Sequence, residues 1–378
     1  MTTDSSSKPA RLASLDKDYQ RFGIERGSAQ PFEDGRHTHG GAGTFEWWYT
    51  DVTFDDGTAV VVIFFTKDYF DVPGKACATV DFEIVDPNGK RTNVWTKARK
   101  GTLLNAAEDI CDVKMETNYI RYEDDGSYHV HYEDHGYVYD AVMKPSAPMW
   151  RPETGHWLYG EGADEKDYGW FVALPEASVD ATLTYGGKTR TFKNGRGYHD
   201  HNWGNVSLEK LMNHWYWGRS HVGPYNVIAC DIIAEEEYGN KRFPVFYLAK
   251  DGRVLSDDAS RTRVERGETH LHPTSGKFMD DDLTYTQVED DGTTYVVRFH
   301  RTGDYNRRSM LEVVPAWKRM LAKAAGLNPT YIRVKGDVSI EVIKDGRSEK
   351  VEDTGLWEQY FMGSNKLATI EGVTIPLS

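Results

Sequence analysis

The sequence predicts an all-β protein made of antiparallel sheets. Tyr, Trp and Phe together supply 13% of the residues, and the chain holds 35 glycines. Aromatic residues favour strands, while long stretches of apolar residues at helical spacing are nearly absent. Dipeptides typical of tight hairpins separate the alternating runs. Together these observations indicate antiparallel meanders that form barrels or sandwiches.

The expected strands and turns follow one another along the whole chain. Alternating or apolar runs occur at Val60–Phe65, Thr79–Val85, Tyr128–Tyr132, Ala181–Tyr185, Tyr295–Phe299 and Val338–Ile343. The expected hairpin turns are Asp56-Gly57, Asn88-Gly89, Asp125-Gly126, Gly186-Gly187, Asp251-Gly252, Asp291-Gly292 and Asp345-Gly346. Gly, Asn and Asp tolerate the positive φ angles that two-residue hairpin turns require, so each dipeptide predicts a reversal between two strands.

One amphipathic helix is predicted in the C-terminal half, from about Leu311 to Ala325. Helical spacing brings four apolar residues onto one stripe: Val314, Trp317, Met320 and Leu321. The expected role of this stripe is packing against a barrel. The basic residues Lys318, Arg319 and Lys323 leave contact with a membrane surface as the alternative.

Length, charge and cysteine content limit the class of protein. At 378 residues the chain exceeds one ordinary core, which predicts two domains. The net charge of −14 argues against nucleic acid or an anionic surface as the main partner. Three cysteines without a CxxC motif give no disulfide framework. No apolar stretch approaches the ~20 residues of a transmembrane helix, and Met1–Ala13 is too polar for a signal peptide. The expected location is the cytoplasm.

An internal repeat predicts the domain organisation. Glu46–Tyr49 aligns with His214–Trp217, and at the same offset Val60–Phe64 aligns with Ile228–Ile232. The two copies indicate two related β-domains in tandem, because repeated supersecondary units mark repeated architecture. The expected join lies near Phe192–Gly197, close to the histidine-rich motif described below. The predicted division is a flexible tail over residues 1–20, one domain over 21–195 and a second over 196–378.

The repeat also singles out Asp231. In the second copy this carboxylate interrupts an apolar strand where the first copy has Ile63. An unpaired buried carboxyl raises its pKa and stays neutral, which would make Asp231 a proton donor. The alternative is a structural ion pair, with Arg219 as the candidate partner.

The segment Gly197–Gly204 is the densest group of chemically useful side chains in the chain. It reads Gly-Tyr-His-Asp-His-Asn-Trp-Gly and contains His199 and His201. Paired histidines on a strand share a face, as metal ligands do, but no third ligand follows at suitable spacing. The same holds for the pairs His37/His39, His129/His131 and His270/His272. The last two pairs are expected on solvated faces, and no metal site is predicted.

Phe45–Tyr49 and Gly195–Gly204 together resemble motifs of the carotenoid hydratase superfamily, also called the hydroxyneurosporene synthase or AttH-like family. This group includes kievitone hydratase-like enzymes and fungal decalin Diels–Alderases. The resemblance covers nearly the whole chain after about Arg21. It implies two lipocalin-like β-barrel domains and no metal or organic cofactor.

The resemblance also implies site residues. A His-x-Trp pair is matched by His201 and Trp203, and the family's carboxylate about thirty residues later by Asp231. The Tyr that precedes this carboxylate by two residues in the family pattern is Ala229 here. Tyr225 is the expected substitute from the same strand face.

The implied reaction is acid-catalysed hydration of an isoprenyl-type double bond in an apolar terpenoid or prenylated substrate. Asp231 is the expected proton donor, and His201 the expected base that orients water. The residues expected to line the substrate are Trp203, Tyr198, Glu46, Trp47, Tyr49, Trp215, Trp217 and Tyr225. Two alternatives stay open: a cyclase or Diels–Alderase acting on a polyketide- or terpenoid-derived substrate, and a non-catalytic lipocalin-like carrier.

Overall fold

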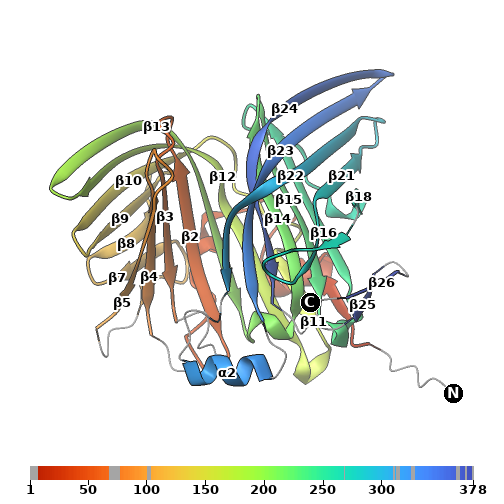
Figure 1. The fold of residues 1–378 in the computed structure, drawn as a ribbon, viewed down its shortest axis with the longest axis horizontal. Coiled ribbons are helices and arrows are strands. Elements are labelled where there is room, and N and C mark those ends of the chain that lie inside the picture. The colour runs from red at the N-terminus through yellow and green to blue at the C-terminus, as the bar shows by residue number, and fades with distance from the viewer. Residues whose placement is uncertain are drawn as a thin grey trace. The chain divides into compact units, whose positions relative to one another are not determined.

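A computed structural model gives the fold of the chain in two compact units (Figure 1). The structure describes residues 7–67, 77–99, 104–267, 269–309, 311, 316–324, 328–362, 367–370 and 373–376. The N-terminal unit comprises Ala13–Trp157 and Lys166–Ser207. The C-terminal unit comprises Met1–Leu12, Leu158–Glu165 and Leu208–Ser378. The sequence divides the chain between Gly195 and Arg196, and in the structure both residues lie inside one strand.

The N-terminal unit is a curled antiparallel sheet with the strand order β5-β4-β3-β2-β13-β12-β10-β9-β8-β7-β6. Its strands are β2 (Phe45–Thr53), β3 (Ala59–Phe65), β4 (Thr79–Val85), β5 (Arg91–Lys97), β6 (Asn105–Ala106), β7 (Asp112–Met115), β8 (Asn118–Tyr122), β9 (Tyr128–Asp134), β10 (Tyr137–Pro145), β12 (Lys166–Tyr185) and β13 (Lys188–Gly204). Off this path, β11 (His156–Tyr159) pairs with β12. β1 (Ala10–Leu12), whose residues are assigned to the C-terminal unit, pairs with β11.

The C-terminal unit contains a second curled antiparallel sheet, with the strand order β17-β16-β15-β14-β24-β23-β22-β21-β18. Its strands are β14 (Met212–Val222), β15 (Tyr225–Ala234), β16 (Arg242–Lys250), β17 (Arg253–Ser256), β18 (Thr262–Arg266), β21 (Asp282–Val288), β22 (Thr294–Ser309), β23 (Thr330–Lys344) and β24 (Arg347–Phe361). Two small ladders pair β19 (Thr269–Leu271) with β20 (Phe278–Asp280), and β25 (Leu367–Ile370) with β26 (Val373–Pro376).

The predicted hairpin turns are confirmed. Each of the seven dipeptides joins two consecutive strands that pair antiparallel, and the glycine of each has a positive φ. The predicted all-β, antiparallel fold class is therefore confirmed. Helical structure is short: α1 (Asp16–Phe22), α2 (Ala316–Ala324) and the 3-10 turns η1 (Pro31–Asp34), η2 (Gly162–Asp164), η3 (Leu208–Lys210), η4 (Glu236–Tyr238) and η5 (Ala259–Arg261).

Two expectations about flanking segments differ from the structure. The segment predicted as a flexible tail contains β1 and most of α1, which ends at Gly23 with φ +66°. The helix predicted from about Leu311 to Ala325 is described as α2 over Ala316–Ala324, and Val314 lies outside the described residues. Its apolar stripe does not pack against a barrel, because Trp317, Met320 and Leu321 are 60%, 67% and 59% exposed. Among the described residues, no helix reaches the length and apolarity needed to cross a membrane.

The strand orders show how the repeat is built. The nine strands from β5 to β8 in the N-terminal sheet can be matched one by one with the nine strands from β17 to β18 in the C-terminal sheet. In this match β2 corresponds to β14, and β3 corresponds to β15. In the first unit Trp48 lies opposite Phe64, and in the second Tyr216 lies opposite Asp231. Asp231 therefore occupies the place of Phe64 rather than that of Ile63. Because successive side chains alternate between faces, this one-residue shift turns Asp231 into the core.

Candidate functional site

The two sequence motifs lie on neighbouring strands of the N-terminal unit. In the antiparallel pair β13–β2, Trp203 lies opposite Glu46, His201 opposite Trp48 and His199 opposite Thr50. Side chains alternate along a strand, so β13 presents two different surfaces. The inward surface, toward the apolar core that contains Trp48 and Trp203, carries His199, His201 and Trp203. The outward surface carries Tyr198, Asp200 and Asn202.

On the inward surface, His201 lies between two buried carboxylates. Its Nε2 is 2.9 Å from Glu46 Oε1, and its Nδ1 is 3.3 Å from Asp34 Oδ1. All three side chains are at most 1% exposed. Burial alone would lower the pKa of His201, but the hydrogen bonds and negative charges of Asp34 and Glu46 outweigh it and raise this pKa. His201 is therefore held as the imidazolium, opposite to the neutral form that a general base needs.

The loop before β2 fixes Glu46 in place. The backbone N–H of His37 donates to Glu46 Oε1 at 2.6 Å, and the N–H and hydroxyl of Thr38 donate to Oε2 at 2.9 and 2.7 Å. Burial tends to raise the pKa of Glu46, but His201 and these donors lower it. These four hydrogen bonds suit a positioning role for Glu46 inside the unit, and its expected contact with substrate stays a prediction.

Asp34 joins the second histidine to the same cluster. Its Oδ2 accepts from the Tyr128 hydroxyl at 2.8 Å and lies 2.9 Å from His199 Nε2. His199 Nδ1 is 2.8 Å from the carbonyl oxygen of Tyr49, which can only accept, so Nδ1 carries a proton. Burial would raise the pKa of Asp34, but the charges and hydrogen bonds of His199 and His201 lower it. Asp34, Glu46, His199 and His201 are called the histidine–carboxylate cluster below.

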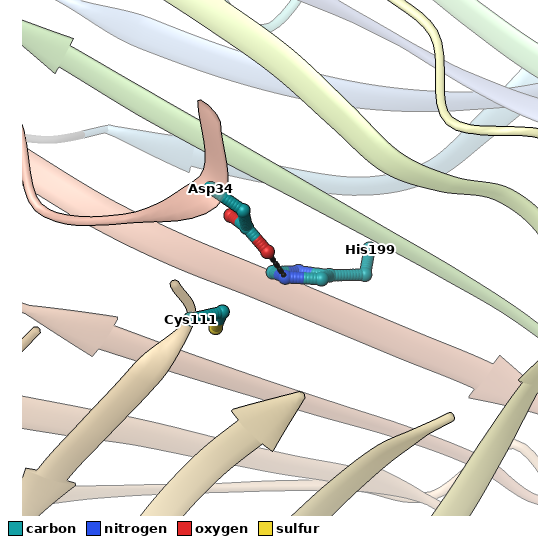
Figure 2. Close-up of side chains that lie close together, drawn as sticks. All are labelled: Asp34, Cys111 and His199. Atoms are coloured by element: carbon teal, nitrogen blue, oxygen red, sulfur yellow. Dashed lines mark hydrogen bonds and ion pairs between the residues drawn. The ribbon is translucent and has the colours of Figure 1, made fainter. Parts of the chain in front are cut away.

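Three side chains next to this cluster could also offer ligands to a metal ion. Asp34, Cys111 and His199 place one ligand atom each within 4.8 Å of one another, the one such group among the described residues (Figure 2). His199 Nε2 and Asp34 Oδ2 already face each other at hydrogen-bonding distance, and Asp34 also accepts from Tyr128. Burial raises the pKa of the Cys111 thiol well above its ordinary value, which disfavours the thiolate that binds metals. The arrangement fits a hydrogen-bonded cluster better than a metal centre.

Trp203 closes the inward surface. Its indole stacks on the His37 ring with 3.6 Å between ring centres and 3° between planes, and it is 6% exposed. A Cβ at Gly169 on β12 would lie 2.0 Å from the indole, so only glycine fits opposite it. Since the exposed His37 ring covers one face of Trp203, the indole is a packing element here, and its expected contact with substrate stays a prediction.

The outward surface carries a second buried carboxyl, Asp200. Its Oδ2 accepts from the Tyr198 hydroxyl at 2.8 Å and from Trp170 Nε1 at 2.9 Å, and its Oδ1 accepts from Asn202 Nδ2 at 3.1 Å. The Asn202 amide is itself oriented by the Tyr168 hydroxyl at 2.8 Å. Burial raises the pKa of Asp200 to about 6, although the donors Tyr198 and Trp170 partly oppose the shift.

Half-buried aromatic rings flank Asp200. Tyr49 lies directly opposite Asp200 across the β2–β13 ladder, and Trp47 lies opposite Asn202. Both rings keep part of their surface accessible, unlike the inward-facing Trp48, which is 0% exposed. The outward surface therefore combines a carboxyl that titrates near neutral pH with accessible aromatic faces.

In the C-terminal unit, Asp231 is an ionised partner of two arginines. Arg242 donates through Nε and Nη2 at 3.1 and 2.7 Å, and Arg266 through Nε and Nη2 at 3.0 and 2.6 Å. Burial would raise the pKa of Asp231, but the charges of Arg266 and Arg242 lower it. The expectation of a neutral Asp231 is therefore wrong. The structural alternative is right in kind, with Arg242 and Arg266 in place of Arg219.

A histidine also belongs to this group, in the opposite state from His201. Arg266 Nη1 lies 3.4 Å from His214 Nε2, and His214 Nδ1 lies 2.9 Å from Asn213 Oδ1. Burial lowers the pKa of His214 well below its ordinary value, and the positive charge of Arg266 lowers it further. Asp231, Arg242, Arg266 and His214 are called the arginine–carboxylate cluster below.

The other expected substrate-binding residues are divided between the two units and between two faces of each sheet. Trp47, Tyr49 and Tyr198 lie on the outward surface of the N-terminal unit. Trp215 and Trp217 are half-buried on the face of β14 away from the core, where Trp215 Nε1 donates to Glu358 at 2.9 Å. Tyr225 faces the core of the C-terminal unit, as Asp231 does, but the two lie six positions apart along β15, about 20 Å. Tyr225 cannot replace the missing tyrosine beside Asp231.

Sequence reasoning missed several residues that build these groups: Asp34, Cys111, Asp200, Arg242 and Arg266. Asp200 lies inside the motif, and the alternation of side chains along a strand could have placed it on the other face of the strand from His199 and His201. Asp34 and the arginines come from distant segments with no local pattern. Of the remaining histidine pairs, His129 and His131 were expected on a solvated face, and both are half-buried on β9. His272 is instead 1% exposed and lies 2.8 Å from Asp304, so the expectation of a solvated side chain was wrong there.

Comparisons with known proteins connect these features to a family. A family model described as Diels-Alderase-like matches residues 41–337. A quinolone epoxide rearrangement protein of Penicillium thymicola is 29% identical over 158 residues, which is 41% of each chain. A hydroxyneurosporene dehydrogenase of Chlorobaculum tepidum is 30% identical over 117 residues, 29% of this chain and 31% of that protein. The matched part thus spans well under half the length of these relatives.

Solved structures with the same fold cover most of the chain. CghA in complex with Sch210972 aligns with a TM-score of 0.59 at 13% identity, over 85% of this chain and 89% of that one. An AttH-like protein of Nitrosomonas europaea gives 0.57 at 17% identity, over 92% and 98%. Kievitone hydratase of Nectria haematococca gives 0.51 at 13% identity, over 87% and 91%. At these identities the likeness concerns the fold alone. The family model and the relatives named above confirm the resemblance that the motifs indicate.

Proposed function

This chain belongs to the Diels-Alderase-like family, and from that premise we propose that it is a cofactor-independent hydratase. The proposed reaction adds water to an isoprenyl-type C=C bond of an apolar terpenoid or prenylated substrate. The observation that carries the proposal is Asp200: a buried, oriented carboxyl with a pKa of about 6, beside accessible aromatic rings. A general acid works best when its pKa lies near the working pH.

The hydrogen bonds of Asp200 favour one oxygen for the proton. Oδ2 accepts from both Tyr198 and Trp170, while Oδ1 accepts from Asn202 alone. An acidic proton therefore resides on Oδ1. Its transfer to one alkene carbon leaves a carbocation on the other carbon and a carboxylate at Asp200. Water adds to the cation, and the proton it loses restores the acid, so the cycle balances without a redox partner.

The aromatic rings beside Asp200 supply the second requirement. An aromatic face stabilises a cation by about 2 kcal/mol or more when water is excluded. Trp47 and Tyr49 are the half-buried rings on the outward surface closest in the ladder to Asp200. They are the proposed contacts for the positive charge and for the apolar substrate.

The proposal moves the acid from Asp231 to Asp200. Asp231 is fixed as a carboxylate by two arginines and has no proton to give at neutral pH. His201, as an imidazolium shared by Asp34 and Glu46, does not act as the base in this scheme. It positions β13 from the inward side, and with it the outward residues Tyr198, Asp200 and Asn202.

Rearrangement or cyclisation is the second candidate, because a relative of this chain is named a quinolone epoxide rearrangement protein. Protonation by Asp200 opens an epoxide by the same chemistry that activates an alkene. The two candidates differ in the product, since hydration incorporates one water molecule and rearrangement or cyclisation incorporates none.

Turnover of a panel of prenylated phenols and linear isoprenoids in water labelled with ¹⁸O tests both candidates. Hydration gives a product heavier by one labelled water, whereas rearrangement gives an isomer of the substrate. Asp200→Asn keeps the shape and removes the acid, so turnover is expected to fall by about 10²–10⁴-fold. The rate of the parent protein should fall tenfold per pH unit above about pH 6, as Asp200 loses its proton.

Glu358→Gln is the matched control. Glu358 lies opposite Trp217, the repeat counterpart of Tyr49, and likewise accepts from an indole. The control should keep turnover within a few-fold. A folded Asp200→Asn protein with near-normal turnover would remove Asp200 from the mechanism. Absence of turnover in every form, with ligand still bound, would favour the carrier.

A further inference from the structure

We propose that α2 is a docking element for a membrane surface rich in anionic phospholipid. This inference is independent of the reaction proposed above. It begins from the exposed side chains of α2, where Trp317, Met320 and Leu321 are 60%, 67% and 59% exposed. Exposed large apolar side chains scattered singly are ordinary, but three gathered on a nine-residue helix mark an interaction surface.

The spacing of these residues makes α2 amphipathic. At about 100° per residue, positions 317, 320, 321 and 324 fall within an arc of about 100°. Positions 318, 319 and 323, which hold Lys318, Arg319 and Lys323, fall on the remaining arc. An apolar stripe with Trp and Leu beside a basic face is typical of helices that lie in the plane of a bilayer interface.

The positive charge of residues 313–336 indicates an anionic partner. The chain as a whole carries −14, yet residues 313–336 contain no Asp or Glu and five basic residues: Lys318, Arg319, Lys323, Arg333 and Lys335. A local reversal of charge in an acidic protein favours contact with an anionic surface over self-association, since a second copy would bring an equally basic helix. An apolar protein partner would not account for the basic arc.

α2 belongs to the connection between β22 and β23, outside the paired strands. The β22–β23 ladder ends at the pair Ser309 and Thr330, and α2 lies in the connection beyond that end (Figure 1). In the N-terminal unit, the corresponding connection from β10 to β12 contains β11 and η2 and no such helix. α2 thus lies outside the strand ladder, where a docking element does not disturb the sheet.

Vesicle flotation of the full-length protein tests the proposal. One set of vesicles contains phosphatidylcholine alone, and the other contains phosphatidylcholine with about 30% phosphatidylglycerol. Binding is expected only to the anionic vesicles and should weaken between about 0.1 and 0.5 M salt, because screening shortens the reach of charge. Lys318→Glu/Arg319→Glu/Lys323→Glu should reduce the partition coefficient at least about tenfold. Trp317→Gln/Met320→Gln/Leu321→Gln should reduce it similarly while leaving the charge unchanged.

The matched control is Lys188→Glu/Arg253→Glu/Arg347→Glu, which makes the same charge change at exposed positions on three other hairpins. It should retain most of the binding. Each variant should also keep the melting temperature of the parent, since Trp317, Met320 and Leu321 are exposed, and so are the three control positions. Equal binding to both vesicle types, or equal loss in the control, would overturn the proposal. So would a concentration-dependent dimer that the Trp317→Gln/Met320→Gln/Leu321→Gln change abolishes, because that result assigns the stripe to a second copy.

Discussion

The two units share a strand order but hold different charged groups in their cores. In the N-terminal unit, β2 and β13 bring the histidine–carboxylate cluster into the core, with the pKa of His201 raised by Asp34 and Glu46. In the C-terminal unit, β14 and β15 bring in the arginine–carboxylate cluster, with the pKa of His214 lowered. The comparison teaches that the sign of the neighbouring charges, and not burial alone, decides whether a core histidine is charged.

The clusters also differ in how they can respond to the loss of a carboxylate. A histidine that loses its carboxylate can release its proton and become neutral. An arginine cannot, because its guanidinium stays charged at any ordinary pH. The N-terminal cluster is therefore adaptable, whereas the C-terminal cluster depends on Asp231.

The largest expected effect is a difference in the free energy of unfolding lost when the carboxylate of each cluster is replaced by an amide. Asp231→Asn leaves the mostly buried side chains of Arg242 and Arg266 facing a neutral amide. This change should lower the free energy of unfolding by about 3–5 kcal/mol. Asp34→Asn should cost less, about 1–3 kcal/mol, because the new amide still accepts from Tyr128 and the His201 imidazolium can lose its proton. Denaturant unfolding of both variants at pH 7 measures the difference.

Replacing an arginine together with its carboxylate partner tests the reason for this loss of stability. Asp231→Asn combined with Arg266→Gln should recover part of the stability, since one uncompensated charge is gone. Equal losses for Asp231→Asn and Asp34→Asn would contradict the distinction between histidine and arginine partners. Any turnover should follow the folded fraction of the Asp231→Asn protein and not fall beyond it.

A smaller effect, of opposite sign in the two units, is expected from pH. The pKa of His201 is raised, so its stabilising contribution is complete below about pH 6.5 and is lost as pH rises through the raised value. The pKa of His214 is lowered, so its contribution is complete above about pH 6.5 and is lost as pH falls below it. Each slope reaches at most about 1.4 kcal/mol per pH unit.

Unfolding of His201→Gln and His214→Gln between pH 5.5 and 8.5 measures these slopes. The stability of the parent protein relative to His201→Gln should decline with rising pH, and relative to His214→Gln it should increase. Slopes of the same sign would show that the two histidines have the same charge state, and the comparison between the units would fail.

The smallest expected effect concerns metal. Elemental analysis of purified protein should find no stoichiometric transition metal, because hydrogen bonds already occupy Asp34 and His199 and burial keeps the Cys111 thiol protonated. Treatment with a chelator should leave the melting temperature unchanged. A stoichiometric metal lost together with Cys111→Ser would instead show that the N-terminal cluster is a metal centre.

Much of the fold could be predicted because it rests on local rules. The dipeptides from Asp56-Gly57 to Asp345-Gly346 reverse the chain through glycine φ angles, a property of the residues themselves. The repeat revealed two corresponding strand pairs. It also misplaced Asp231 by one position, because the short turn at Gly223-Pro224 changes the register and sequence alignment does not detect a shift in pairing.

The sequence by itself determined the fold class, the turns and the family. Only the tertiary structure decided the charge states on which chemistry depends. Asp231 is ionised because Arg242 and Arg266 approach it from other strands, and His201 is charged because Asp34 comes from a segment 167 positions away. A pKa depends on the solvent lost and the charges gained, and both are set by residues distant in sequence that folding brings together.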